Sequence, residues 1–333
     1  MTWYQSSGKD SDIVLSTRVR LARNLKDFPF PNRLDKNERK KVNETVRDVL
    51  LKDDDSLFYT EMSALTSYQA VSLAEKHLIS PEFASDSTGR ALILSKDEDV
   101  SVMLCEEDHV RLQVIYPGLS LKEAFEKAGQ LDKKLSSALG IAFDDRIGYL
   151  TQCPTNLGTG MRASVMLHLP ALSQSTAISR LAATVSKLGL TLRGAYGEGS
   201  RPTGDIYQLS NQVTLGISEE AAIKNLNSIA EQIISQERQA RQSLLKDDVF
   251  IDKIYRSYGI LRSAHMMSCD EFTSLISYVR IGACAGLLDV PVEKLTNLLV
   301  KMQPATINAD AGEKYTSAQR DVIRADAVKK ALE

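Results

Sequence analysis

The stretch Cys153-Pro154-Thr155-Asn156-Leu157-Gly158-Thr159-Gly160-Met161-Arg162 combines a thiol, a glycine- and threonine-rich turn and an arginine. Neighbouring cations lower the pKa of a cysteine thiol. Glycines let backbone amides approach a ligand, and the planar fork of an arginine fits phosphate oxygens. The stretch therefore suits a reaction between a guanidinium-like group and a phosphate-like group. The alternative interpretation is a glycine-rich turn with a buried cysteine and a surface arginine.

The composition of the 333-residue chain is that of an ordinary globular protein, with 43% hydrophobic and 25% charged residues. The net charge of -2 argues against nucleic acid as an obligatory partner. Its four cysteines are far apart and lack metal-ligand spacing, which fits free thiols in a reducing compartment. Neither a secretion signal nor a membrane-spanning run is visible. We expect a cytoplasmic protein that binds neither membrane nor nucleic acid directly.

Residues 13–22 alternate between two faces and predict a half-buried strand. Ile13, Leu15, Thr17, Val19 and Leu21 share one face, and Val14, Ser16, Arg18, Arg20 and Ala22 share the other. Two adjacent arginines on the open face repel each other, which an anion bound between them would relieve. The alternative is a solvated strand face.

Hydrophobic periodicity predicts the remaining elements. We expect strands at 92–95, 100–105, 110–116, 148–152, 163–169, 190–193 and 207–215, and helices at 36–52, 68–78, 122–139, 177–188 and from the N-cap Ser218 to about 244. Beyond residue 247 the pattern is helical only, with a loop expected at 307–313. The order of elements predicts a mixed domain with strands, of the α/β or α+β class, followed by a small helical domain.

The acidic run Glu106-Glu107-Asp108 lies between two apolar strands, where acids are uncommon and costly to bury unpaired. If a strand continued through it, Glu107, His109 and Arg111 would share one face with Cys105 and Gln113, whereas a turn at 106–108 would break this register. A carboxylate cluster could also hold Mg²⁺, and a polar bend at a sheet edge is the alternative.

The stretch 193–200 is glycine-rich and contains Arg193 and Glu198, but it has neither a Walker nor a Rossmann pattern. It suggests a mobile lid over a substrate, although many surface loops have this composition. Several arginines without a Walker loop would bind a polyphosphate, and carboxylates would orient a planar cation. A guanidinium is the cation that fits such carboxylates, and it becomes nucleophilic only when a carboxylate removes its proton.

Four runs in this order, Ser16–Arg20, Glu106–His109, Cys153–Thr159 and Arg193–Glu198, resemble the ATP:guanido phosphotransferases, or phosphagen kinases. Within that family the chain is most similar to the bacterial protein-arginine kinase branch, the only branch that matches beyond Lys246. The resemblance implies an α+β fold: a phosphagen-kinase-like catalytic domain at residues 13–246, with an antiparallel sheet flanked by helices. It also implies an all-helical C-terminal domain at 247–333 for dimerisation and phosphoarginine binding.

The resemblance also implies roles for individual residues. Glu107 would be the catalytic carboxylate, while Glu198 and Cys153 would position the guanidinium. The positions implied to hold ATP are Ser16, Thr17, Arg18, Val19, Arg20, His77, Arg111, Arg162, Ala163, Ser164, Val165, Met166, Arg193, Gly194, Ala195, Tyr196, Gly197 and Glu198. Mg²⁺ would be held mainly by nucleotide phosphates and water, with no protein ligand. Cys105 stands where the family usually has asparagine.

The run Arg320-Asp321-Val322-Ile323-Arg324-Ala325 resembles the allosteric phosphoarginine motif of the same branch. Its two arginines are one helical turn apart and could bind a phosphate while Asp321 binds a guanidinium. The alternative, which is the commoner interpretation of such a pattern, is a salt-bridged helix end. The arginine strand begins at residue 13, which leaves no room for the helical N-terminal domain of small-guanidine kinases. This difference favours arginine side chains of proteins as substrates.

The resemblance further implies partners: a stress-response repressor among the substrates, a zinc-finger-type activator, a Clp-type protease that degrades the marked proteins, and a second copy in a homodimer. Two rival functions stay open, a kinase of a small free guanidine such as arginine and a non-catalytic phosphoarginine reader or adaptor. A reader has no need of a base at Glu107.

Overall fold

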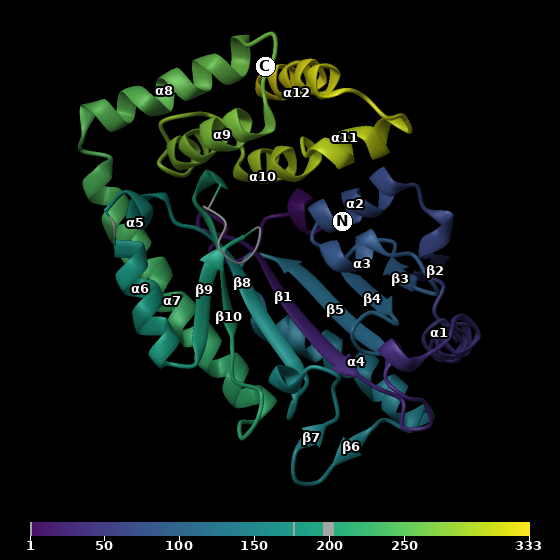
Figure 1. Cartoon of the computed structure of the whole chain (residues 1–333). Helices are drawn as coiled ribbons and strands as arrows, with labels where there is room; N and C mark the ends of the chain where they lie inside the picture. The colour runs from purple at the N-terminus through teal and green to yellow at the C-terminus, as the bar shows by residue number, and fades with distance from the viewer. Residues whose placement is uncertain (1, 176, 196–202) are drawn as a thin grey trace.

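The computed structural model describes residues 2–175, 177–195 and 203–333, and its centre is a single antiparallel sheet (Figure 1). Eight strands pair in the order β2-β3-β4-β5-β1-β8-β10-β9. They are β1 (Val14–Arg23), β2 (Leu57–Glu61), β3 (Ala91–Ser95), β4 (Val100–Leu104), β5 (Val110–Pro117), β8 (Met161–His168), β9 (Leu190–Gly194) and β10 (Ile206–Asn211), with β6 (Phe143–Asp144) and β7 (Gly148–Tyr149) as a separate ribbon. The α+β fold with an antiparallel sheet is confirmed.

Helices cover one face of this sheet and also flank its edges. They are α1 (Lys36–Leu50), α2 (Ser67–Glu75), α3 (Pro81–Ser85), α4 (Leu121–Ala138), α5 (Pro170–Gln174), α6 (Ala177–Lys187) and α7 (Glu219–Leu244). Val19 and Leu21 of β1 lie in one core with Ala124 of α4 and Leu226 of α7. Ser218 caps α7 as predicted, because its hydroxyl accepts a hydrogen bond from the amide of Ala221 at 3.2 Å. The opposite face of the central strands carries the arginines.

Strand β1 departs from simple alternation at its first residues. The register with β8 shifts between Val14 and Ser16, so a bulge interrupts the period of two there. Val14 consequently lies in the same core as Val19, whereas Leu15 lies in a second core with residues of the C-terminal helices. The prediction that Leu15 shares a face with Val19 was therefore wrong, while the placement of Arg18 and Arg20 on the open face was right.

Several other local predictions also need correction. Residues 105–109 form a turn, so the continuous strand face from Cys105 to Gln113 does not exist. Residues 307–311, expected in a loop, belong to the helix α11 (Pro304–Ala311), because Pro304 occupies its first position and Gly312 ends it in a left-handed conformation. Strand β2 was not predicted from the sequence, and β7 and β10 are shorter than expected.

The C-terminal helices pack across one end of the sheet (Figure 1). Besides α11, they are α8 (Asp248–Ser263), α9 (Cys269–Cys284), α10 (Val292–Lys301) and α12 (Ser317–Leu332). Where the structure describes residues 248–333, they contain no strand, as predicted. Glu75 at the end of α2 accepts hydrogen bonds from the amides of Ala305 and Thr306, at 2.9 and 2.7 Å, which fixes the start of α11 against the sheet region.

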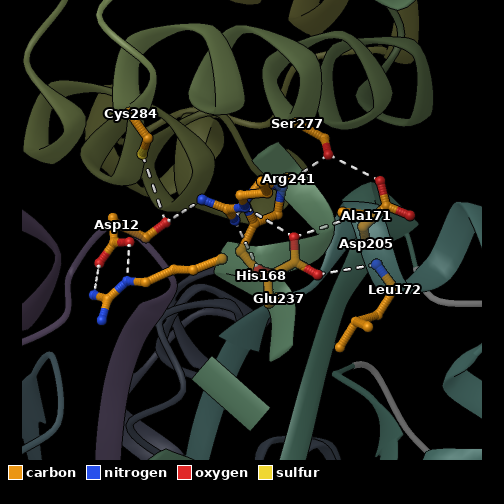
Figure 2. A network of polar contacts seen from close by, with 10 residues as sticks. Asp12, His168, Ala171, Leu172, Asp205, Glu237, Arg241, Ser277 and Cys284 are labelled. Carbon is orange, nitrogen blue, oxygen red and sulfur yellow. Dashed lines mark hydrogen bonds and ion pairs between the residues drawn. The ribbon is translucent and has the colours of Figure 1, made fainter. Parts of the chain in front are cut away.

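A buried polar network also joins the two regions (Figure 2). Arg241 of α7 pairs with Glu237 at 2.8 Å and donates to the carbonyl oxygens of Asp12 and His168. His168 in turn is 2.9 Å from the hydroxyl of Ser277 on α9, which donates to Asp205. The C-terminal helices are therefore held in one position relative to β8 and α7. No helix in the described part of the chain is long and apolar enough to cross a membrane.

Candidate active site

Strand register gathers the arginines on one face of the sheet. In an antiparallel pair, directly opposite residues point to the same side. Arg20 on β1 is opposite Arg162 on β8 and Gln113 on β5, and Arg18 is opposite Ser164. The five predicted arginines line a single cavity of about 840 Å³: Arg18, Arg20, Arg111, Arg162 and Arg193. Side chains from four strands thus converge although they are far apart in sequence.

These cations are crowded and poorly solvated. Burial, together with the charge of Arg111, lowers the pKa of Arg18 to about 10. Burial and the repulsion of Arg18, Arg111 and Arg162 hold the pKa of Arg20 well below its usual range. Within the described residues, the buried Nε atoms of Arg20 and Arg162 have no hydrogen-bond partner. A polyanion would supply both the missing acceptors and the missing negative charge.

His77 lines the same cavity from the end of α2. Its backbone is in the left-handed region, with φ of 61°, and its carbonyl accepts a hydrogen bond from Nε2 of Gln113 at 2.9 Å. Burial, with the charge of Arg18 as a second cause, lowers the pKa of the imidazole to about 3. His77 is therefore neutral at physiological pH and presents a hydrogen-bonding ring to the cavity.

The three acids of the turn at 106–108 have different roles. Glu106 forms an ion pair with Arg111 and accepts a hydrogen bond from Ser80; these partners outweigh its burial and lower its pKa. Asp108 accepts hydrogen bonds from Nδ2 of Asn24 at 2.6 Å and from the amide of Gln152 at 2.8 Å. Asp108 therefore ties the acidic turn to the segment that enters the cysteine loop.

Glu107 lies with Asp108 in the wall of a small cavity beside the arginines. Burial raises its pKa, and the neighbouring Asp108 raises it further, while Arg111 opposes both. It lines a small cavity of about 220 Å³ together with Cys153. Arg20, Arg111 and Arg162 line both this cavity and the larger one. A carboxylate of raised basicity and a thiol thus lie directly beside the arginine cluster.

The cysteine loop is positioned by backbone contacts that only glycine permits. Gly158 has φ of 99°, and a Cβ atom there would lie 2.1 Å from the carbonyl oxygen of Thr214. The hydroxyl of Thr214 donates to the carbonyl oxygens of Thr155 and Leu157, at 3.0 and 2.7 Å. The thiol of Cys153 lies 3.0 Å from the hydroxyl of Thr155. The loop is held closely against the strand end that follows β10.

Not every predicted nucleotide-site residue lines a cavity. Thr17, Val19, Ala163 and Val165 are fully buried on the opposite side of the strands, so their side chains support the arginines from the core. Ser16, Ser164 and Met166 are also buried, and Gly194 and Ala195 line the larger cavity. Tyr196, Gly197 and Glu198 lie outside the described residues.

Sequence reasoning missed several residues that shape the site. Asn24 holds Asp108, and Ser80 holds Glu106. Arg23 is buried and forms two hydrogen bonds to Asp132, at 2.9 and 2.8 Å, beneath the cysteine loop. The contact of Arg23 with Asp132 could have been sought from the sequence, because Arg23 is the third arginine between residues 18 and 23. Isolated polar residues such as Asn24 carry no comparable sequence signal.

In the motif at 320–325, the arginines differ in their surroundings. Arg324 is 1% exposed, pairs with Asp321 at 2.6 Å and donates to the carbonyl oxygens of Met267 and Met302. Arg320 is half-buried and donates to the carbonyl oxygen of Tyr315 at 2.7 Å. Arg324 therefore connects the segments before α9 and after α10, while Arg320 is the more accessible cation of the motif.

Comparison with known proteins agrees with this geometry. Residues 39–240 match the family model of the ATP:guanido phosphotransferase C-terminal catalytic domain. The chain belongs to the ATP:guanido phosphotransferase family. Residues 247–333 match the model of the protein-arginine kinase McsB C-terminal domain. As a member of this family the protein is an ATP-using phosphotransferase.

Curated relatives resemble the chain over nearly its whole length. Protein-arginine kinase of Halothermothrix orenii is 45% identical and covers 99% of this chain and 96% of its own. That of Caldanaerobacter subterraneus subsp. tengcongensis is 47% identical and covers 96% of each chain. Among solved structures, the chain resembles a duplicated taurocyamine kinase of Schistosoma mansoni with bound transition-state-analogue components. The two are 28% identical, with a TM-score of 0.61, and the match covers 71% of this chain and 35% of that chain. Lombricine kinase is 26% identical, with a TM-score of 0.61 over 70% of this chain and 68% of that one.

Proposed function

We propose that the chain is a protein-arginine kinase, which transfers the γ-phosphoryl group of ATP to arginine side chains of proteins. The observation that carries this proposal is the adjacency of two cavities. One is lined by five arginines, and the other holds Glu107 and Cys153. The shared walls, Arg20, Arg111 and Arg162, lie where a phosphoryl group would pass from the first cavity to the second.

In this mechanism, the arginines of the larger cavity bind the phosphates of ATP and neutralise the charge that develops during transfer. The substrate guanidinium enters the smaller cavity beside Cys153, where Glu107 accepts its proton. The freed nitrogen attacks the γ-phosphorus in line, the bond from that phosphorus to the bridging oxygen breaks, and ADP leaves. The raised pKa of Glu107 makes the carboxylate a better base for this step.

Mg²⁺ would screen the phosphate charges when bound with ATP. Among the residues that the structure describes, no group of three or more His, Cys, Asp or Glu side chains could hold a metal ion. The family resemblance implies that the metal is held mainly through nucleotide phosphates and water, and the arginines would carry the protein's share of charge neutralisation.

The choice of a protein substrate rests on the comparisons. The relatives named protein-arginine kinase resemble this chain over its C-terminal helices as well as its sheet. The solved taurocyamine and lombricine kinase structures match less of the chain, between 70% and 82% of it. Because these kinases share the fold, phosphorylation of a small free guanidine is the rival function.

Mass spectrometry separates these functions. An arginine-rich protein is incubated with the enzyme, ATP and Mg²⁺ under neutral handling, and a parallel tube contains free arginine. Phosphate on protein arginines alone supports the proposal, and phosphate on the free amino acid alone supports the small-guanidine rival. No phosphate in either tube points to a missing activator or to a phosphoarginine reader.

Glu107→Gln tests the assigned base. The variant should lose at least ~100-fold in kcat because the guanidinium keeps its proton, while its affinity for ATP changes little. Lys122→Gln, on the exposed surface of α4, is the matched control and should keep wild-type activity. Near-normal turnover by Glu107→Gln would refute the role of this residue.

The family resemblance extends the proposal to regulation and partners. Phosphoarginine would bind at Arg320 and Asp321 as an allosteric ligand, products would be degraded by a Clp-type protease, and a stress-response repressor would be a substrate. A zinc-finger-type activator and a second copy of the chain would be partners in the cytoplasm.

Because Arg324 is buried, Arg320→Ala is the better test of the allosteric site: basal activity should persist while activation by added phosphoarginine is lost. An unchanged response would remove the allosteric claim.

A further inference from the structure

The cavity that contains the five arginines extends beyond the sheet to the C-terminal helices. Its far wall is formed by Cys269 and Asp270, at the start of α9, and by Gln303 and Pro304, at the start of α11. From the other side, Val71 and Ala74 of α2 complete this end. Its total volume, about 840 Å³, is in the range of sites that enclose a whole nucleotide.

The direction of a bound nucleotide follows from the order of residues along β1. Ala22 lines the small cavity with Glu107, Arg20 lines both cavities, and Arg18 lines only the larger one. Leu15, nearer the start of the strand, packs in the core that contains the C-terminal helices. If the γ-phosphate lies at Arg20 and Arg162, the rest of the nucleotide must extend past Arg18 toward α9 and α11.

Charge supports the same direction. Asp270 lies in the first turn of α9, where the helix dipole favours an ionised carboxylate. A carboxylate repels phosphates and accepts hydrogen bonds only, so its partners are donors such as ribose hydroxyls or an exocyclic amino group. Val71, Ala74 and Pro304 offer apolar surface for the flat face of a base. This end of the cavity therefore suits a nucleoside and not a phosphate.

We propose that the C-terminal helices complete the ATP site, with Asp270 contacting the nucleoside while Cys269, Gln303 and Pro304 form the wall behind it. This inference rests on the proposed function, because it requires that the arginines bind ATP phosphates. It adds residues from outside the sheet region to the substrate site.

The wall is fixed in place before any ligand binds. The thiol of Cys269 is 3.6 Å from Oε1 of Gln303, whose Nε2 donates to the carbonyl of Leu299 at 2.9 Å. The buried Arg324 donates to the carbonyls of Met267 and Met302, the residues two positions before Cys269 and one before Gln303. A wall that is already ordered adds affinity, because its side chains lose little conformational entropy when the nucleotide binds.

The first test is the affinity for Mg·ADP, measured by calorimetry on the full chain. Asp270→Ala should weaken binding roughly tenfold, as expected for the loss of a hydrogen bond to a charged group, and raise KM for ATP with kcat nearly unchanged. Glu271→Ala removes the neighbouring acid, which does not line the cavity, and should bind like the unaltered chain. Equal affinities for the two variants would overturn the inference.

The second test follows alkylation of the cysteines by mass spectrometry, with and without saturating Mg·ADP. The nucleotide should slow alkylation of Cys269 at least fivefold and leave Cys284, at the other end of α9, unaffected. Nucleotide binding without protection of Cys269 would overturn this inference alone. Failure of the unaltered chain to bind Mg·ADP would overturn both this inference and the proposed function.

Discussion

Arg20 lies directly opposite Arg162 across the β1–β8 pair, with Arg18 and Arg111 close by. Like charges opposite each other in a sheet are destabilising, and a buried Nε that has no partner among the described residues adds to the cost. The cluster therefore stores an unfavourable free energy in the nucleotide-free protein. Under the proposed function, that free energy would be released when the phosphates of ATP bind between the cations.

Arg20→Met should separate stability from function. Removing one cation from the cluster should raise the free energy of unfolding of the nucleotide-free protein by about 0.5–2 kcal/mol, because repulsion falls and the aliphatic stem is kept. Urea unfolding measures this change, and calorimetry should show that Mg·ADP binding is lost. A variant that is less stable than the unaltered chain would contradict the proposed repulsion.

The pH dependence of activity tests the proposed role of Glu107 as general base. A general base acts only when it is deprotonated, and burial together with Asp108 raises the pKa of Glu107. Activity should therefore fall as the pH is lowered, with a midpoint above the ordinary glutamate value of 4.5. ADP release at saturating substrate, followed across the pH range, measures this midpoint.

Asp108→Asn is a directed test of that assignment. An asparagine oxygen can still accept from Asn24 and Gln152, but the negative charge beside Glu107 is gone. The acidic limb of the profile should move to lower pH because one cause of the raised pKa is removed. If the acidic limb of the pH–activity profile stayed at the same pH, a group other than Glu107 would govern it.

At the scale of elements, the cysteine loop depends on close backbone contact with the segment after β10. Gly158→Ala should destabilise the protein by more than ~2 kcal/mol, since the methyl group would meet the carbonyl oxygen of Thr214 and the backbone has positive φ. The same shift would displace Cys153 and lower kcat. Unfolding curves and steady-state kinetics measure the two effects.

Gly216→Ala is the matched control for this loop. Gly216 also has positive φ, at 77°, but no atom of the other described residues, apart from its chain neighbours, lies within 4 Å of the position of an added Cβ. Its substitution should cost only about 1 kcal/mol, from the left-handed conformation, and leave kcat unchanged. If both variants lost equal stability and activity, the contact with Thr214 would not be what positions the loop.

At the scale of the whole molecule, Arg241 of α7 joins β8 to the segment at Asp12, and His168 of β8 continues the network to Ser277 of the C-terminal helix α9 (Figure 2). Arg241→Met would leave Glu237 buried without its cation, which costs about 3–5 kcal/mol in similar cases. Adding Glu237→Gln should recover part of this loss, because the amide oxygen can still accept from Ala171 or Leu172. Urea unfolding of Arg241→Met, Glu237→Gln and the double variant measures the coupling, and purely additive losses would contradict it.

The sequence by itself indicated most of the strands and helices, although not β2 or α11, and the residue types that gather at the candidate site. Alternation over residues 13–22 specifies a strand, and Ser218 followed by two glutamates specifies a helix start, because both signals depend on neighbours in the chain. The arginine, carboxylate and thiol motifs also indicated the family, since they are short runs of contiguous residues.

Only the tertiary structure decided how these motifs meet. The turn at 105–109 directs Glu107 toward Cys153, and strand pairing brings Arg162 opposite Arg20. Likewise, the packing of α11 against α2, and of α9 and α11 against α10, places Asp270 at the end of the arginine cavity. Local periodicity cannot specify such contacts, because they join residues whose separation in the chain is bridged only by sheet register and by burial of a shared core.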